Sequence, residues 1–215
     1  MKFFREVLFI FMLAFFFAGI TAGANLMLSP RIRLNEETRH TEYLLTALGI
    51  PFPKGGDAAQ LRKIQNDHVA EAALDGEQVY RGYDDEGKPI GYAFPIGGKG
   101  FWGRIEALLA LNNDLTEIKG IVFTRNVETP GLGARITEKW FRDQFQGIEL
   151  PSKREKGKYV VVSKKDPQKK HHVDAITGAT MTSSLVEEFL NNDIRRILAE
   201  KDEIRRIEWQ SPRKK

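Results

Sequence analysis

The sequence predicts an α+β fold in which a curved antiparallel sheet packs against helices, preceded by one N-terminal transmembrane helix. Two pairs of strand-like runs, each pair joined by a short turn, occupy the middle of the chain, and helical patterns follow them. A long uncharged apolar run near the start predicts the transmembrane helix. We expect four parts: an anchor at 1–30, a juxtamembrane helix at 31–50, a main domain at 51–200 and a charged tail at 201–215.

Composition excludes several classes of protein. The formal net charge is only +4 over 215 residues, and acidic residues are spread among the basic ones, so a nucleic-acid-binding face is not expected. One basic cluster between Lys153 and His172 is interpreted as a solvated strand and loop, with docking of an acidic partner as the alternative. The chain has no cysteine, which excludes cysteine-ligated iron–sulfur clusters, thiol chemistry and disulfides.

The N-terminal segment predicts that the main domain is exported. Lys2 and Arg5 precede the apolar run and favour a cytoplasmic N-terminus, although Arg31 and Arg33 on the other flank weaken this charge signal. A cleaved signal peptide is the alternative, because residues 22–24 read Ala-Gly-Ala, as in a cleavage site. We expect an uncleaved, single-pass anchor in a bacterial cytoplasmic membrane, with the domain on the extracytoplasmic side.

The elements of the first half follow from periodicity and turn residues. Apolar spacing predicts a helix over 37–48, ended by a glycine, and a weaker helix over 61–73. Alternating residues predict two hairpins, the first formed by 77–83 and 89–96 and the second by 105–111 and 116–125.

The glycine-rich run at 97–103 is interpreted as a bend between strands. It lacks the Gly-Lys-Ser/Thr ending of a phosphate loop and does not open a helix. Trp102 in this run is interpreted as a core or edge tryptophan, with contact to a flat cofactor as the alternative. The next elements are a helix at 138–146 with Trp140, Phe141 and Phe145 on its core face, and a short buried strand at 159–163.

The most informative stretch is Asp-Ala-Ile-Thr-Gly-Ala-Thr-Met-Thr-Ser at 174–183. It places a flexible turn with clustered hydroxyls ahead of a helix whose apolar residues recur at helical spacing from Leu185 onward. Helix N-termini favour phosphate, so Thr180 could lie beside a phosphate or carry one covalently. The alternative is an ordinary Ser/Thr helix cap.

Two motifs resemble those of one family. Asp-x-x-Thr-Gly-Ala-Thr, which ends at Thr180, resembles the flavinylation motif of the FMN-binding domain shared by NqrC of the sodium-translocating NADH:quinone reductase and RnfG of the Rnf complex. Glu-Thr-Pro-Gly-Leu-Gly at 128–133 resembles the loop that lies beside the flavin ring in that family. The run Gly-Lys-Gly-Phe-Trp at 98–102 is similar to NqrC and favours that branch.

The resemblance implies a covalent cofactor. It implies that a flavin transferase joins FMN by a phosphoester to Thr180, and that Asp174 serves recognition by this transferase. It assigns Glu128 to orienting the ring or ribityl chain, and Leu132 to packing on the ring face. The cofactor-binding residues that it implies are Thr180, Thr177, Gly178, Ala179, Thr182, Glu128, Thr129, Gly131, Leu132 and Gly133.

The expected function is therefore electron transfer by a membrane-anchored subunit that works with the other membrane subunits of an ion-translocating oxidoreductase and is not catalytic alone. A stand-alone exported flavoprotein is one alternative, and a binding or sensor module without flavin is another. We expect no metal site, because His171 and His172 are adjacent and would point to opposite faces of a strand, and His40 and His68 are isolated.

Overall fold

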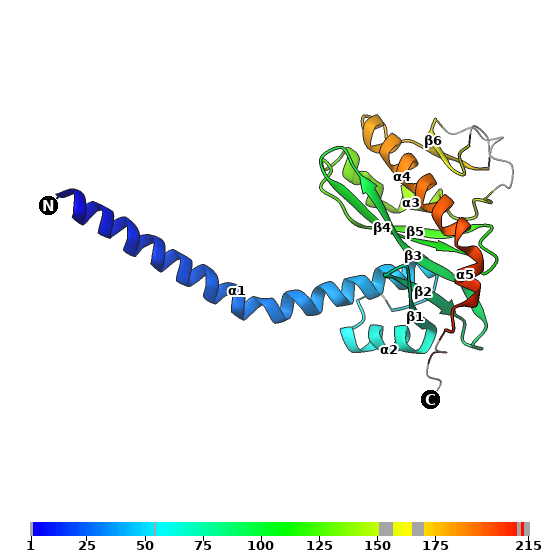
Figure 1. Cartoon of the computed structure of the whole chain (residues 1–215), viewed down its shortest axis with the longest axis horizontal. Coiled ribbons are helices and arrows are strands. Elements are labelled where there is room, and N and C mark those ends of the chain that lie inside the picture. Colours follow the sequence, from blue (N-terminus) through cyan, green and yellow to red (C-terminus); the bar gives the residue numbers. More distant parts are fainter. Residues whose placement is uncertain (1, 54, 151–156, 165–169, 210–211, 213–215) are drawn as a thin grey trace. The chain divides into compact units, whose positions relative to one another are not determined.

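The computed structural model describes residues 2–53, 55–150, 157–164, 170–209 and 212. The chain forms two compact units, Met1–Arg39 and His40–Lys215. The first unit is helical, and the second holds a sheet with packed helices (Figure 1). The predicted α+β class is confirmed. The four boundaries expected from the sequence stay predictions.

Part of the basic cluster between Lys153 and His172 lies outside the described residues. Within the described residues, Lys158 pairs with Glu187, and Lys170 lies 3.7 Å from Glu149. The other members Lys153, Arg154, Lys156, Lys165 and Lys169 lie outside the described residues.

Helix α1, Lys2–Leu48, continues without a break from the apolar run into the predicted juxtamembrane helix. Its most apolar window has a mean hydropathy of 2.4 and is 0% buried. In the described part of the chain, α1 is the one helix that is long and apolar enough to cross a membrane. The hydroxyls of Thr21 and Ser29 donate to the carbonyl oxygens of Phe17 (2.8 Å) and Asn25 (2.5 Å). These two hydroxyl groups are thus satisfied within the helix.

The sheet has five strands in chain order, each antiparallel to the next. Both predicted hairpins are confirmed, as β2–β3 and β4–β5. The pairing shifts register between Gly82 and Tyr83 and between Glu106 and Ala107, and such bulges bend a sheet. The strands are β1 (Val69–Leu74), β2 (Glu77–Tyr83), β3 (Pro89–Lys99), β4 (Arg104–Leu111) and β5 (Ile118–Arg125).

The helix predicted over 61–73 is wrong in its second half. Helix α2 covers Ala58–His68 and is capped by the Asp57 carboxylate. Strand β1 follows directly and pairs with β2 along its whole length. The Ala-Glu-Ala-Ala run within β1 favours a helix by local propensity. Backbone pairing with a neighbouring strand overrides that preference, and sequence periodicity does not reveal it.

Strand β3 continues through the two glycines that were predicted to form a bend. Gly97 pairs with Glu106 and Gly98 with Ile105, so the bend begins only after Lys99. A Cβ on Gly98 would collide with the Cβ of Phe189. The glycine is therefore needed because helix α4 lies directly against the strand at this point.

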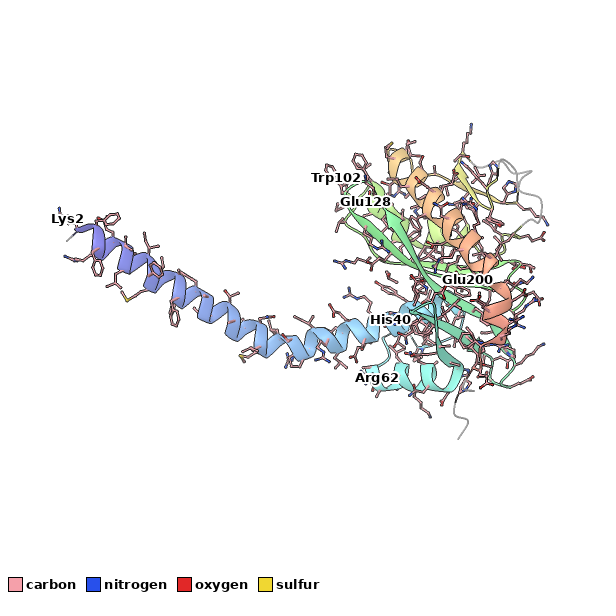
Figure 2. All side chains as sticks on the ribbon, viewed as in Figure 1. Lys2, His40, Arg62, Trp102, Glu128 and Glu200 are labelled. Atoms are coloured by element: carbon pink, nitrogen blue, oxygen red, sulfur yellow. The ribbon has the colours of Figure 1, made fainter. Side chains whose placement is uncertain are left out.

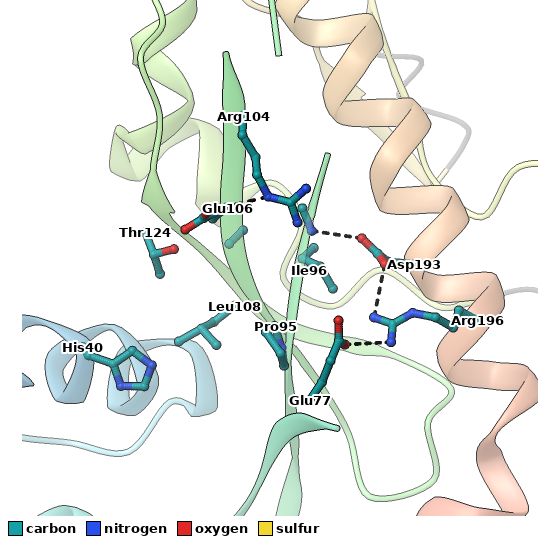
Figure 3. Close-up of a pocket in the computed structure, with 12 residues that line it drawn as sticks. His40, Glu77, Pro95, Ile96, Arg104, Glu106, Leu108, Thr124, Asp193 and Arg196 are labelled. Atoms are coloured by element: carbon teal, nitrogen blue, oxygen red, sulfur yellow. Dashed lines mark hydrogen bonds and ion pairs between the residues drawn. The ribbon is translucent and has the colours of Figure 1, made fainter. Parts of the chain in front are cut away.

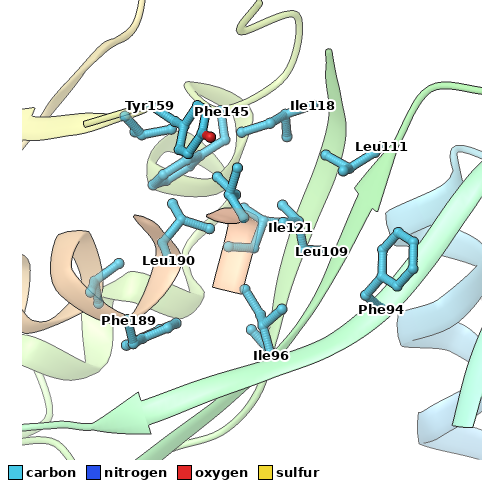
Figure 4. Packing of buried hydrophobic residues seen from close by; sticks show 14 of the residues in the cluster. Phe94, Ile96, Leu109, Leu111, Ile118, Ile121, Phe145, Tyr159, Phe189 and Leu190 are labelled. Atoms are coloured by element: carbon cyan, nitrogen blue, oxygen red, sulfur yellow. The ribbon is translucent and has the colours of Figure 1, made fainter. Parts of the chain in front are cut away.

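Helix α4, Thr180–Ala199, lies across one face of the sheet (Figure 1). It begins before Leu185, the residue from which the apolar spacing recurs in the sequence, and supplies Phe189 and Leu190 to the main core. Figure 4 shows these side chains meeting Ile96, Leu109 and Ile121 from the strands. The opposite face of the sheet carries a second core, in which the last turns of α1 pack on it. That core includes Leu44, Leu45, Leu48, Leu108 and Val122.

The helix predicted over 138–146 is shorter in the structure. Helix α3 covers Lys139–Asp143, after the 3-10 helix η1 at Gly133–Thr137. Phe141 and Phe145 are fully buried as predicted, but Trp140 is 39% exposed. Trp140 instead lies under the Arg135 guanidinium, 5.1 Å from the ring centroid, so its assignment to the core is wrong.

A small parallel pair was not predicted. Strand β6, Val161–Ser163, pairs with β7, His172–Asp174, and only the first lies within the predicted strand at 159–163. The buried Asn191 side chain on α4 holds the chain just before β6. Its Oδ1 accepts from the backbone N–H groups of Tyr159 (2.5 Å) and Val160 (3.1 Å), and its Nδ2 donates to the Val160 carbonyl (2.8 Å). Beyond α4, helix α5 covers Lys201–Arg206.

We predict that Asn191→Ala destabilises the domain strongly, because it removes the side chain that accepts from the buried N–H groups of Tyr159 and Val160 and donates to the Val160 carbonyl. The expected loss of unfolding free energy is about 2–4 kcal/mol. Asn192→Ala is the matched control, since Asn192 is exposed on the same helix and its side chain accepts a hydrogen bond from the exposed Arg195. Urea unfolding of the detergent-solubilised chain measures both. Equal midpoints for the two variants would contradict the assignment.

Candidate functional site

Three segments far apart in the sequence meet at one end of the sheet. They are the loop 100–103 between β3 and β4, the segment 126–133 after β5, and the turn 174–180 that enters α4. Figure 2 shows Trp102 and Glu128, from the first two segments, side by side. The structure therefore brings together the two motifs that the sequence singled out.

Glu128 connects its own segment to the loop 100–103 and to the first turn of α4. Its side chain is buried, with 5% exposed. Oε1 accepts from the backbone N–H of Trp102 at 3.2 Å, and Oε2 accepts from the Thr182 hydroxyl at 2.7 Å. The carboxylate thus ties the loop 100–103 and the first turn of α4 to the end of β5.

The residues after Glu128 form a tight turn. The N–H of Leu132 donates to the carbonyl of Thr129 at 3.1 Å, and Gly131 has φ of +76°. Proline followed by a residue with positive φ is the pattern of a type II turn, so the Pro-Gly pair is explained by the backbone. Thr129 also accepts from the indole N–H of Trp102 at 3.0 Å.

Gly133 meets protein atoms rather than open space. A Cβ at this position would lie 2.6 Å from the Thr182 hydroxyl oxygen and 2.7 Å from Oε2 of Glu128. Gly100 is similar, since its Cβ would lie 2.5 Å from Oε1 of Glu128. At both glycines a Cβ would overlap the buried Glu128 carboxylate, a contact that the sequence did not indicate.

The turn before α4 is held from both sides. The Ser183 hydroxyl accepts from the N–H of Ile176 at 3.1 Å. Gly178 has φ of +80°, and Leu132 Cδ2 lies 3.1 Å from the place of its absent Cβ. Leu132 of one motif therefore leans against Gly178 of the other.

Helix α4 begins without a side-chain cap. Its N-cap residue is Ala179, and among the described residues no side chain caps the helix start. Thr180 is the first helical residue and is exposed. The first backbone N–H groups of a helix have no partner inside it and attract anions. The alternative in which Thr180 is the helix cap does not agree with this geometry.

Exposed apolar side chains gather around this helix start. Exposed apolar side chains that cluster are a feature of binding surfaces. In the described part of the second unit, the large apolar residues that are more than 40% exposed all belong to these segments or to the first turn of α4. They are Phe101 (51%), Trp102 (67%), Val127 (58%), Leu132 (43%) and Met181 (58%).

Two predicted site residues lie apart from the Glu128 contacts. Thr177 is exposed in the turn, and Asp174 ends β7, where its N–H donates to Gln144 Oε1 at 2.9 Å. Trp102 was interpreted as a core or edge residue; it is 67% exposed, so it is not a core residue, and its indole N–H donates to Thr129 in the segment 126–133. Its position within the glycine-rich run 97–103 was the available signal. Among the described residues there is no cluster of three or more potential metal ligands.

A separate pocket of about 290 Å³ lies where β2 leaves the edge of β3 (Figure 3). Its charged groups satisfy one another: Arg196 contacts Glu77 at 2.7 Å and Asp193 at 3.3 Å, and Arg104 lies 3.6 Å from Glu106. Asp193 also accepts from the N–H of Gly97 at 3.0 Å. Asp193 thus attaches α4 to the free edge of β3, which is a structural role.

Burial raises the pKa of Asp193, although the bond from Gly97 and the nearby Arg196 oppose the shift. Arg196 offsets the effect of burial on the Asp193 pKa only in part, because the guanidinium of Arg196 lies closer to Glu77 than to Asp193.

The fold and the site together define a ligand-binding domain. An antiparallel sheet carries one long helix, and the uncapped start of that helix lies among apolar side chains, which suits a flat ligand with an anionic group. Residues 100–195 match the family described as FMN-binding domain, and the chain belongs to this family.

Relatives come from both branches of the family. The chain is 31% identical over 132 residues to NqrC of the Na(+)-translocating NADH-quinone reductase of Vibrio alginolyticus, covering 61% of this chain and 48% of that protein. It is 32% identical over 149 residues to the RnfG-type protein of the Na(+)-translocating ferredoxin:NAD(+) oxidoreductase complex of Acetobacterium woodii, covering 66% of this chain and 68% of that protein. The chain thus spans about half the length of the Vibrio relative.

A solved structure shares the fold. The crystal structure of NqrC of the Na(+)-translocating NADH-quinone reductase from Parabacteroides distasonis superposes with a TM-score of 0.65 at 22% identity, covering 80% of this chain and 95% of that one.

The residues present fit FMN. The exposed faces of Trp102, Leu132 and Met181 suit a flat aromatic ring. The unpaired N–H groups at the start of α4 suit a phosphate.

We predict that Gly133→Ala destabilises the unmodified chain by about 1–3 kcal/mol, because the added methyl group overlaps Glu128 and Thr182. Gly131→Ala is the matched control: it adds the same methyl group in open space and costs only about 1 kcal/mol for its positive φ. Urea unfolding in detergent compares the two. A larger loss at Gly131 than at Gly133 would show that the contact with Glu128 is not what excludes a side chain.

We predict that the unfolding free energy of Asp193→Asn increases relative to that of the unchanged chain as the pH rises. Because the folded-state pKa is raised, the stability contributed by Asp193 is fully present below its ordinary, unfolded pKa and is lost as the pH rises through the folded-state pKa. Asparagine keeps an acceptor for Gly97 and cannot ionise. Urea unfolding at pH 4 and pH 6 measures the trend, with the exposed Asp114→Asn as control. A difference that does not change with pH would contradict the raised pKa.

Proposed function

We propose that this chain is a membrane-anchored electron-transfer subunit that carries FMN through a phosphoester bond to Thr180. The observation that supports this most directly is the position of Thr180. It is exposed, it is the first residue of an uncapped twenty-residue helix, and it stands at the end of the motif that resembles the flavinylation sequence.

The residues of the site would divide the work between the two ends of FMN. The first N–H groups of α4 would face the phosphate and offset its charge. Trp102, Leu132 and Met181 would contact the ring, and Thr129 holds Trp102 in place through the indole hydrogen bond. Gly178 and Ala179 keep the approach to Thr180 free of large side chains. FMN supplies the electron-accepting and electron-donating chemistry, while the protein supplies orientation and charge.

Attachment requires a flavin transferase and an activated flavin donor. A flavin dinucleotide provides one: the Thr180 hydroxyl oxygen forms the new bond to phosphorus, the phosphoanhydride bond breaks, and the hydroxyl proton leaves with the released nucleotide. We propose that Asp174, six residues before Thr180, is part of the surface that this transferase recognises. Its place at the end of β7 sets it outside the Glu128 contacts.

The proposed location follows from α1 and the flanking charges. Helix α1 would cross the bacterial cytoplasmic membrane once, and Lys2 and Arg5 favour a cytoplasmic N-terminus. The FMN domain would then lie on the extracytoplasmic side. A covalent bond suits that location, because FMN that dissociates there would be lost.

The proposed partners are the other membrane subunits of an ion-translocating oxidoreductase. The two relatives described above are named as subunits of such complexes, one of the NADH-quinone type and one of the ferredoxin:NAD type. A stand-alone exported flavoprotein is the second candidate function. Genes for the remaining subunits beside the gene for this chain distinguish the two.

We predict that Thr180→Ala abolishes covalent flavin. The chain is produced together with a flavin transferase and run on a denaturing gel, where the unchanged protein gives a fluorescent band. Thr180→Ser keeps the hydroxyl and retains the band, and Thr177→Ala, at the exposed neighbouring threonine of the same turn, also retains it. Undiminished fluorescence in Thr180→Ala would refute the attachment site, and a dark band in the unchanged protein would refute covalent flavin.

A further inference from the structure

Glu128 is an unusual group in this domain. Among the described residues it is the one acidic side chain in the buried set, with 5% exposed. Its hydrogen-bond partners are neutral, namely the N–H of Trp102 and the Thr182 hydroxyl. In the described part of the chain no lysine or arginine forms an ion pair with it. A buried carboxylate without a cation is costly, so its presence requires an explanation.

The hydrogen bonds by which Glu128 holds the surrounding segments do not by themselves explain why this residue is charged. The two bonds that Glu128 accepts join neutral donors, and a neutral amide side chain of the same size could accept from Trp102 and donate to Thr182. The glycines at 100 and 133 leave space for a side chain of this shape, and a glutamine would fill the same space. Compared with an amide, a carboxylate adds a fixed negative charge between Trp102 and the first turn of α4.

We propose that the Glu128 carboxylate sets the reduction potential of the flavin by opposing the negative charge that reduction adds. The proposal rests on the proposed function, since it requires FMN on Thr180. Glu128 contacts Thr182, two residues after the attachment point, and Trp102, a proposed wall for the ring. Because the group is buried, water and salt screen its field weakly.

The expected direction follows from charge. Uptake of two electrons and one proton gives a reduced flavin with one more negative charge than the oxidised form. A nearby fixed negative charge destabilises that product and lowers the potential. Glu128 acts on the flavin through its field and through the groups it holds, so it is a positioning and charge-supplying residue.

Two nearly isosteric substitutions separate charge from support. Glu128→Gln removes the charge and keeps the acceptor for Trp102. Thr182→Val removes the hydroxyl donor and keeps the charge, which is then less compensated. The full-length flavinylated proteins are titrated in a spectroelectrochemical cell, which reports the potential without any partner. We expect the potential to rise in Glu128→Gln, by about 30 mV for each tenfold change in the two-electron equilibrium, and to fall in Thr182→Val.

Opposite shifts support the proposal, because mere loosening of the site would move both variants in the same direction. An unchanged potential in Glu128→Gln, or shifts of the same sign, overturns it. Lower flavin content in a variant does not affect the measurement, since the potential is read from the flavinylated fraction.

A variant that takes up no flavin is also informative. If Glu128→Gln is dark, Glu128→Asp is tested, which keeps the charge one methylene group shorter. Flavin in the aspartate variant with a potential near that of the unchanged protein supports the proposal, whereas a clearly raised potential in that variant, or no flavin in either variant, overturns it. If the unchanged protein carries no covalent flavin, the proposed function itself is refuted. This result is distinguishable from one that refutes only the role of Glu128.

Discussion

The packing of α4 against the sheet is the constraint on which the rest of the domain depends. Phe189 occupies the space left by Gly98, and Asp193 attaches the same helix to the free edge of β3. Asn191 holds the chain that leads into β6. Since these contacts lie along the middle of the helix, they fix the direction in which its first turn points. The position of Thr180 is therefore a consequence of the core and does not depend on the surrounding loops alone.

The loops add a second level of organisation at the start of that helix. Glu128 and Thr182 are 54 positions apart and meet within 2.7 Å, which joins the end of β5 to the first turn of α4. The glycines of the two motifs serve different purposes. Gly131 and Gly178 adopt positive φ, whereas Gly133 gives space to the buried carboxylate. A glycine-rich motif is thus explained in part by the protein's own packing, before any cofactor is considered.

The sequence allowed prediction of the features that arise from local pattern: the two hairpins, the helical periodicity of α4, and the two motifs. Prediction from the sequence failed where the structure of a segment depends on contacts with residues far away in the sequence. Strand β1 has helix-favouring alanines and becomes a strand because β2 pairs with it. The contact of Glu128 with Thr182 leaves no periodic signal, and neither does the parallel pairing of β6 with β7. Trp140 follows the helical pattern of a core residue, yet it is partly exposed beside Arg135.

The exposure of the site gives a physical reason for a covalent bond in the proposed function. Enclosed ligand pockets bury most of a ligand's surface, and that burial supplies much of the affinity. Trp102 and Met181 remain 67% and 58% exposed, so they form a shallow surface that could orient a ring but would retain it weakly. A phosphoester at Thr180 removes the need for strong retention, because the ligand can no longer dissociate. The loops are then free to leave one side of the ring open, which is what electron exchange with a partner requires.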